Sequence, residues 1–264
     1  PYLVAVRDTD VNQYFKKAKH LKRYAVNILR NAAVVVFLSK PYKENVINKF
    51  VPRRYRDDIL ENSRVIPNGI SSFWLSNKFY DKPNISFNNK IINLLFVGQV
   101  IRRKNIETTI RAITELKKRL NKKIKFIVIG EKKDLKYYDK ISGLGSFEYK
   151  SYLTKEELIN YYRNSDIFVM PSYTETFGLV YAEALTQGLP VIYSYDQGFD
   201  GQFKEGTVGY GVNPSNIEDI VNKIQLIFRR YATISRQCID NVDKFDWKKI
   251  SCTYKQLYTK ICNK

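Results

Sequence analysis

Short apolar runs alternate with amphipathic segments along most of the chain. The apolar runs predict buried strands at 92–97, 124–129, 146–149, 167–170, 189–193 and 208–212. The segments between and after them predict helices at 105–120, 134–141, 155–163, 177–185 and 217–231. Apolar strands that alternate with helices indicate a parallel sheet covered on both faces. We therefore expect a complete α/β domain over residues 91–245.

The first 70 residues repeat this pattern on a smaller scale. They predict strands at 2–6 and 32–38, helices at 11–30 and 41–50, and an extended segment at 65–70. Residues 30–39 also echo residues 163–172, which indicates two similar sheets. We expect 1–70 to be the end of one domain, 71–90 an irregular linker, and 246–264 a helix that packs back toward the first domain.

Composition places the chain among globular proteins of two modest domains. Its 264 residues are 44% hydrophobic and 27% charged, and no apolar run reaches the roughly eighteen residues of a membrane span. The net charge of +19 favours an anionic partner, either a membrane surface or a nucleic acid, although lysine-rich surfaces are common. The three cysteines lack metal-ligand spacing, so free thiols in a reducing compartment, the cytoplasm, are expected.

The stretch 171–185 carries the chemistry. A strand ends at Pro171, Thr174 and Thr176 are candidate N-caps, and a helix follows. The first-turn amides of that helix suit a phosphate, and the carboxylates Glu175 and Glu183 suit sugar hydroxyls. The alternative is that one glutamate stabilises the helix N-terminus and the other lies on a solvated face.

Glu175 and Glu183 are separated by seven residues that include Phe177-Gly178-Leu179-Val180. This spacing resembles the E-x7-E signature of the retaining glycosyltransferases of family four. The resemblance implies the α/β GT-B fold, with two Rossmann-like doubly wound parallel-sheet domains. The chain begins at Pro1, so the first domain is expected to be incomplete.

A second motif follows the strand at 92–97. Gly98 permits close approach of a ligand, and Lys104 stands before a helix. The family pattern is Gly-Arg-Leu, three variable residues and Lys; Lys104 matches its end, whereas Gln99 replaces the Arg. Arg102 or Arg103 is the candidate replacement for that charge, with Arg102 preferred, and the alternative is a solvated basic loop.

The resemblance implies a donor site without a metal or cofactor. Tyr152 and Leu153 follow the strand at 146–149, where the family docks the base, although packing on the sheet edge is equally compatible. Asp8-Thr9-Asp10 has the form of a metal motif, but no third ligand is evident. The implied donor-binding residues are Gly98, Gln99, Arg102, Lys104, Tyr152, Leu153, Glu175, Phe177, Gly178, Leu179, Val180 and Glu183, with Lys104 and Glu175 in catalytic roles.

The function that follows is transfer of a sugar from a nucleotide sugar to an acceptor hydroxyl, with retention, in surface polysaccharide or glycolipid synthesis. A glycan or lipid-linked acceptor is expected, at the inner face of an anionic membrane, to which the basic segment Lys16–Arg23 would bind. The alternatives are a nucleic-acid-binding α/β protein, or an epimerase or phosphorylase of the same fold. No nucleic-acid-binding module is recognisable, and the basic residues are scattered.

Overall fold

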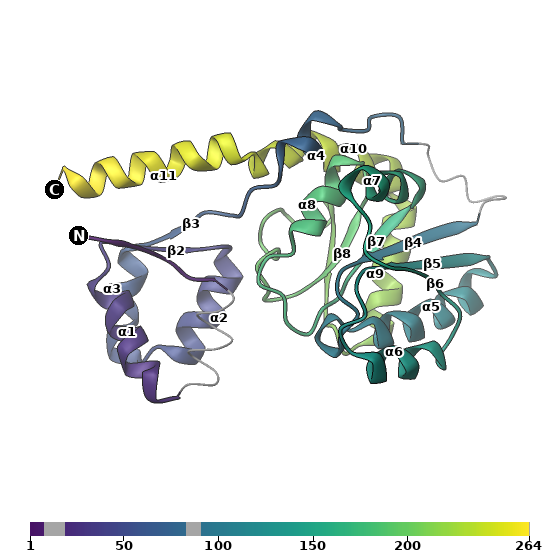
Figure 1. Ribbon diagram of the computed structural model, residues 1–264, viewed down its shortest axis with the longest axis horizontal. Helices are drawn as coiled ribbons and strands as arrows, with labels where there is room; N and C mark the ends of the chain where they lie inside the picture. The colour runs from purple at the N-terminus through teal and green to yellow at the C-terminus, as the bar shows by residue number, and fades with distance from the viewer. Residues whose placement is uncertain (8–18, 83–90, 264) are drawn as a thin grey trace.

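The computed structural model describes residues 1–7, 19–82 and 91–263, and Figure 1 shows its two layered units. Among these residues the strands form two parallel sheets, one of order β1-β2-β3 and one of order β6-β5-β4-β7-β8-β9. We call residues 1–70 the N-terminal unit and residues 91–245 the C-terminal unit.

The six-stranded sheet of the C-terminal unit is built from apolar strands. They are β4 Ile92–Val97, β5 Ile124–Ile129, β6 Glu148–Lys150, β7 Ile167–Val169, β8 Val191–Ser194 and β9 Gly209–Val212. In register, Leu94 pairs with Phe126 on one side and with Ile167 on the other. The order therefore reverses between β4 and β7, and in such sheets ligands bind beyond the carboxyl ends of the strands at that point.

Helices cover both faces of this sheet (Figure 1). They are α5 Ile106–Leu120, α6 Leu135–Ser142, α7 Lys155–Asn164, α8 Leu179–Thr186, α9 Ile217–Arg229 and α10 Tyr231–Asn241. The predicted helix 217–231 ends at Arg229, and α10 was not predicted. The predicted caps Thr174 and Thr176 are wrong, because α8 begins at Leu179 with Gly178 as its N-cap and has no side-chain cap.

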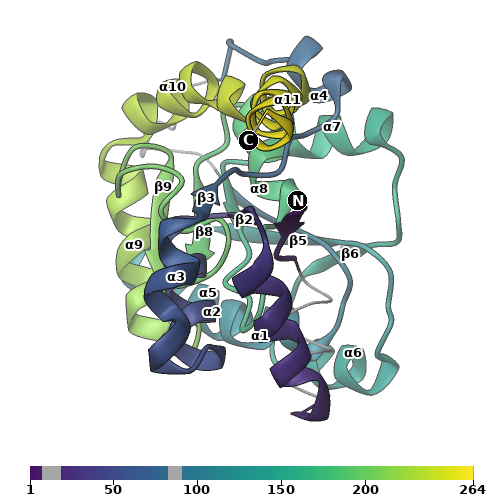
Figure 2. The ribbon, with the colours of Figure 1, turned by 90° about the vertical axis from the view of Figure 1, so that its left-hand side faces the viewer.

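The N-terminal unit holds the smaller sheet. Its strands are β1 Leu3–Ala5, β2 Val34–Phe37 and β3 Ser63–Val65, and its helical segments are η2 Lys19–Leu21, α1 Lys22–Asn31, α2 Lys40–Phe50, η3 Arg53–Tyr55 and α3 Arg56–Glu61. Helices α1, α2 and α3 lie on one side of this sheet (Figures 1 and 2). The two echoing sequence segments form β2 and β7, which are both interior strands fully buried from solvent.

The chain crosses between the units twice, and the two crossings run side by side. Ile70 N–H donates to Phe245 O at 2.9 Å, and the backbone of Gly69 lies against the ring of Trp247. The first crossing holds the short helix α4 Ser72–Ser76, whose Trp74 is 2% exposed, so the linker is partly helical rather than irregular.

The second crossing leads through η5 Val242–Phe245 into α11 Trp247–Cys262, which runs back over the smaller sheet (Figure 1). Ile250 and Ile261 of α11 form one apolar cluster with Val34, Val36 and Ile66 of the sheet. The helix therefore covers the sheet face opposite α1–α3, although its sequence follows the C-terminal unit.

Candidate functional site

Lys104 lies where β4 ends, at the point where the strand order reverses. The chain passes through Gly98 into the 3₁₀ turn η4 Arg102–Lys104, and Lys104 is only 8% exposed. Asn105 follows with a left-handed backbone, and its Nδ2 donates to Pro171 O at 2.9 Å and to Pro214 O at 2.6 Å. These bonds fix the loop after β4 against the loops after β7 and β9.

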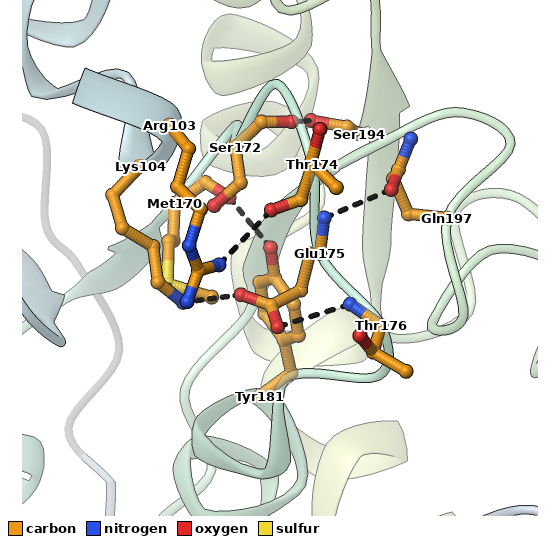
Figure 3. Close-up of polar contacts among 10 residues, drawn as sticks. All are labelled: Arg103, Lys104, Met170, Ser172, Thr174, Glu175, Thr176, Tyr181, Ser194 and Gln197. Atoms are coloured by element: carbon orange, nitrogen blue, oxygen red, sulfur yellow. Dashed lines mark hydrogen bonds and ion pairs between the residues drawn. The ribbon is translucent and has the colours of Figure 1, made fainter. Parts of the chain in front are cut away.

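Glu175 lies in that second loop and forms an ion pair with Lys104 (Figure 3). The Lys104 ammonium donates to Glu175 Oε2, and the Thr176 N–H donates to Glu175 Oε1 at 3.1 Å. Both side chains are about nine-tenths buried, at 10% and 11% exposure. A Cβ on Gly98 would lie 3.8 Å from Lys104 Cε, so Gly98 packs beside the same lysine.

The pair can change partners when an anion binds. A buried ammonium is stable only beside a counter-charge, and Glu175 supplies one here. A diphosphate in the crevice would offer Lys104 a second counter-charge and would release Glu175 to accept hydrogen bonds from hydroxyl groups. The geometry therefore suits a ligand that carries both an anionic group and hydroxyl groups.

The N-terminus of α8 opens beside this pair. Gly178 has φ of 75°, and a Cβ there would lie 2.5 Å from the Tyr181 ring and 3.3 Å from Glu175 Cγ. Tyr181 is held in turn, because its hydroxyl donates to Met170 O at 2.5 Å. Glycine thus lets the chain pass beside Glu175 into the helix, where the Tyr181 N–H donates to Gly178 O at 3.0 Å and the amides of Leu179 and Val180 precede the first bond of the helix.

The flanking predicted residues divide in their exposure. Leu179 is 41% exposed and Val180 is half-buried. Phe177 is 2% exposed and packs on Phe199 and Phe245, so its side chain is buried and only its backbone could contact a bound donor substrate.

Glu183 lies further along α8, with other neighbours. The Tyr162 hydroxyl donates to its Oε2 at 3.4 Å, and the Trp74 indole also hydrogen-bonds to it. Burial raises the pKa of Glu183 to about 7, and the bonds from Tyr162 and Trp74 oppose that rise. Its contacts thus join α8 to α7 and α4, whereas the Glu175 contacts join the loops after β4 and β7.

The remaining predicted residues lie at the rim or elsewhere. Gln99 and Arg102 are exposed, Tyr152 is 77% exposed, and Leu153 packs partly against the core. Arg7 donates to the Tyr254 hydroxyl at 2.9 Å. The motif at 8–10 and residues 16–18 lie outside the described residues.

A cavity of about 150 Å³ faces Glu175 from the N-terminal unit. Tyr42, Asn45 and Lys49 of α2 line it, together with Gln197 from the loop after β8. Gln197 Oε1 accepts the N–H of Glu175 at 2.9 Å. Sequence reasoning missed the three residues of α2, because no motif marks them and only the docking of the two units brings them to Glu175.

The family can now be stated. The family described as "Glycosyl transferases group 1" matches residues 78–245, which is more than half of the chain. The chain belongs to this family. The match spans both loops that form the ion pair and all of α8.

Curated relatives resemble most of the chain at low identity. Alpha-monoglucosyldiacylglycerol synthase of Acholeplasma laidlawii is 27% identical over 226 residues, 78% of this chain and 55% of the relative. A glycosyltransferase of Methanocaldococcus jannaschii is 25% identical over 270 residues, 95% and 67% respectively. Sulfoquinovosyl transferase of Arabidopsis thaliana is 35% identical over 102 residues, 36% of this chain and 20% of the relative. The chain thus spans between a fifth and two thirds of these relatives.

Solved structures confirm the fold. Sucrose-phosphate synthase from Thermosynechococcus elongatus has a TM-score of 0.76 at 23% identity, covering 99% of this chain and 68% of that one. HepE of Anabaena in complex with UDP-glucose has a TM-score of 0.73 at 18% identity, covering 98% and 72%. The predicted GT-B fold is confirmed, and so is the family.

Proposed function

We propose that the protein transfers a sugar from a nucleotide-sugar donor to an acceptor hydroxyl with retention of anomeric configuration. The observation that carries this proposal is the buried Lys104–Glu175 pair, set where the strand order reverses and beside the N-terminus of α8. Family membership supports glycosyl transfer, and the titles of the HepE complexes name UDP and UDP-glucose as ligands of that protein.

Each residue has a task that follows from its place. Lys104 and the first-turn amides of α8 neutralise the charge that grows on the leaving diphosphate. Glu175, released by Lys104, accepts hydrogen bonds from the sugar hydroxyls and orients the anomeric carbon. Glu183 accepts hydrogen bonds from the ribose diol. Gly98 and the backbone of Gly178 leave room for the phosphates.

The test combines binding with product analysis. The protein is titrated with UDP by calorimetry, and the product formed from UDP-glucose is examined by proton NMR, where the anomeric coupling constant reports retention or inversion. Lys104→Ala is expected to lower kcat about 100-fold or more, since it removes a preorganised charge. Lys118→Ala, an exposed lysine of α5, is the matched control.

Three results would contradict the proposal: inverted product, conversion of donor without acceptor, or wild-type turnover by Lys104→Ala. Glu183→Ala is expected to weaken UDP binding, and equal affinity would contradict its assignment to the ribose.

We further propose that no metal or other cofactor takes part. Turnover is then expected to stay unchanged in EDTA and on addition of Mg²⁺ or Mn²⁺.

We also propose a lipid-linked or glycan acceptor, in polysaccharide or glycolipid synthesis, used at the cytoplasmic face of an anionic membrane. A groove of about 580 Å³ between α1 and η3 is lined by Lys22, Arg23 and Arg54, and none of its described lining residues is a carboxylate. The guanidinium of Arg54 lies 4.7 Å from the ring centre of Tyr55, which also lines the groove. Such a surface attracts phosphate-bearing headgroups.

Sedimentation with vesicles tests this surface. Binding is expected to vesicles with anionic lipid and not to neutral ones, and Arg23→Glu/Arg54→Glu should abolish it. Lys117→Glu/Lys118→Glu, the same charge change on α5, serves as the control. Equal binding to both kinds of vesicle, or tighter binding to duplex DNA than to anionic vesicles, would contradict the membrane assignment. In the described residues no helix is long and apolar enough to cross a membrane.

A further inference from the structure

We propose that Gln197 is a positioning residue for Glu175. We further propose that, through the segment 196–202, the position of Glu175 depends on docking of the N-terminal unit. The inference rests on the proposed role of Glu175. Gln197 has two contacts that face opposite ways. Its Oε1 accepts the Glu175 N–H at 2.9 Å (Figure 3), and its backbone oxygen accepts from Ser39 Oγ at 3.4 Å.

The segment moves with the loop that carries Glu175, because the two are packed without free space. A Cβ on Gly198 would lie 1.6 Å from Thr176 O, so the two backbones are in direct contact. Phe199 is 1% exposed and packs on Phe177 and Tyr181. A shift of this segment therefore has to displace the residues next to Glu175.

The N-terminal unit docks on the same segment. Gln202 is 8% exposed, and its Nε2 donates to Leu38 O at 2.7 Å and to Gly198 O at 3.0 Å. Asn45 Nδ2 donates to Asp196 O at 3.3 Å. A Cβ on Gly201 would lie 2.6 Å from Pro41. The junction of β2 and α2 is thus bonded to both ends of the segment.

These contacts form one continuous chain of bonds. It runs from Leu38 to Gln202 and Gly198, which both belong to the segment. From Gln197, the neighbour of Gly198, it continues through Glu175 to Lys104. When the units separate, the segment loses its hydrogen bonds to the N-terminal unit. Glu175 then loses the bond to Gln197 that fixes its backbone. The carboxylate is then set for a donor sugar only while the two units are docked.

Hydrogen exchange of the Glu175 amide tests this without any substrate. Gln202→Met removes the bond to Leu38 of the N-terminal unit and the bond to Gly198 within the segment, and it touches no atom of Glu175. We expect the Glu175 amide to exchange about tenfold faster in this variant, while the amides of β7 keep wild-type rates. The same substitution at Gln256, an exposed residue of α11, is the control and should change nothing. An unchanged Glu175 rate in Gln202→Met would overturn the coupling.

Direct variants of Gln197 test the positioning role. Gln197→Met lacks the acceptor oxygen, and we expect faster exchange at Glu175, with kcat lowered about tenfold and the Kd for UDP within twofold. Gln197→Glu keeps an acceptor oxygen and should restore slow exchange. A wild-type exchange rate of the Glu175 amide in Gln197→Met would overturn the positioning role. If the amide exchanges faster as expected but the wild-type protein transfers no sugar, only the proposed function is overturned.

Discussion

At the scale of single residues, the site depends on a buried ion pair. Removing one member of such a pair leaves an uncompensated charge and costs about 3–5 kcal/mol, whereas removing both can be nearly neutral. Lys104 and Glu175 are both about nine-tenths buried, so this asymmetry applies to them. The pair therefore holds the loops after β4 and β7 together.

A double-mutant cycle measures this asymmetry. Lys104→Met is expected to lower the free energy of unfolding by about 3 kcal/mol or more, because the buried Glu175 side chain then loses its counter-charge. The double variant Lys104→Met/Glu175→Gln should be more stable than Lys104→Met alone. Urea unfolding of the wild type, the single variants Lys104→Met and Glu175→Gln, and the double variant gives the coupling energy. Strictly additive effects would show that the two side chains do not interact in solution.

Glu183 predicts a pH dependence of stability. Its pKa in the folded protein is about 7, above the ordinary value of 4.5, so the folded state holds a proton that the unfolded state has lost between these two pH values. The stability of the wild type should therefore fall as pH rises through this window. Relative to Glu183→Gln, it should lose about 2–3 kcal/mol between pH 5 and pH 8.

Urea unfolding of both proteins at the two pH values is the measurement. A constant difference between the wild type and Glu183→Gln would show that the carboxyl titrates at its ordinary value. Tyr162→Phe sharpens the test, because the lost hydrogen bond should raise the pKa further and move the window upward. The control is Glu44→Gln, an exposed glutamate of α2.

The sequence predicted the site only where contacts are local. The resemblance to two family motifs identified Glu175, Glu183 and Lys104 as candidate site residues, because the motif spacing is local in the sequence: Lys104 and Glu175 lie in loops after strands, and Glu183 lies within α8. It could not show that Glu183 is buried, since Trp74 reaches it from the crossing segment. The sequence placed the glycine-containing loop 196–201 beside the pocket, but it could not show that Gln197 contacts Glu175, because that contact exists only after β7 and β8 have paired.

At the scale of elements, the entry to α8 departs from the expected capping. Two threonines precede the helix, yet the chain turns at Gly178 in a left-handed conformation. That conformation brings the backbone close to Tyr181 and Glu175, which a side chain would prevent. The helix start is therefore set by the site and by tertiary packing rather than by local capping preference.

Gly178→Ala tests this arrangement. The new methyl group would meet the Tyr181 ring at 2.5 Å in a left-handed backbone, so we expect a loss of about 1–3 kcal/mol in unfolding free energy and weaker UDP binding. Gly143→Ala is the matched control, since Gly143 has φ of −81° and its nearest atom would lie 3.7 Å away. Equal stability of the two variants would contradict the argument.

Element prediction succeeded where the pattern was long. The strands at 92–97 and 124–129 and the helix at 105–120 match β4, β5 and α5 to within one residue. The short helix α4 was missed because its five residues are held by burial of Trp74 and not by propensity. The end of α9 at Arg229 was missed because the polar residues Arg229 and Arg230 have no strong stop signal.

At the scale of the whole molecule, α11 is the unusual part. It follows the C-terminal unit in sequence but covers the sheet of the N-terminal unit. The described part of the N-terminal unit therefore has one sheet face whose apolar cover comes from the far end of the chain. The sequence predicted a helix here that packs back toward the first domain, but only the structure shows that it meets Val34 and Val36 of β2 and Ile66 after β3.

Removing α11 should therefore destabilise the distant unit first. A chain ending at Asp246 is expected to expose Val34, Val36 and Ile66, so the N-terminal unit should become susceptible to protease while the C-terminal unit stays resistant. Limited trypsin digestion with mass spectrometry identifies the surviving fragment. Ile250→Ala, a buried contact of the same cluster, should destabilise the N-terminal unit by about 2–4 kcal/mol. Tyr258→Ala, a residue of the same helix that is 53% exposed, should have little effect. If the two units were digested at equal rates, α11 would have to be treated as part of the C-terminal unit, and the division into units at residue 246 would be wrong.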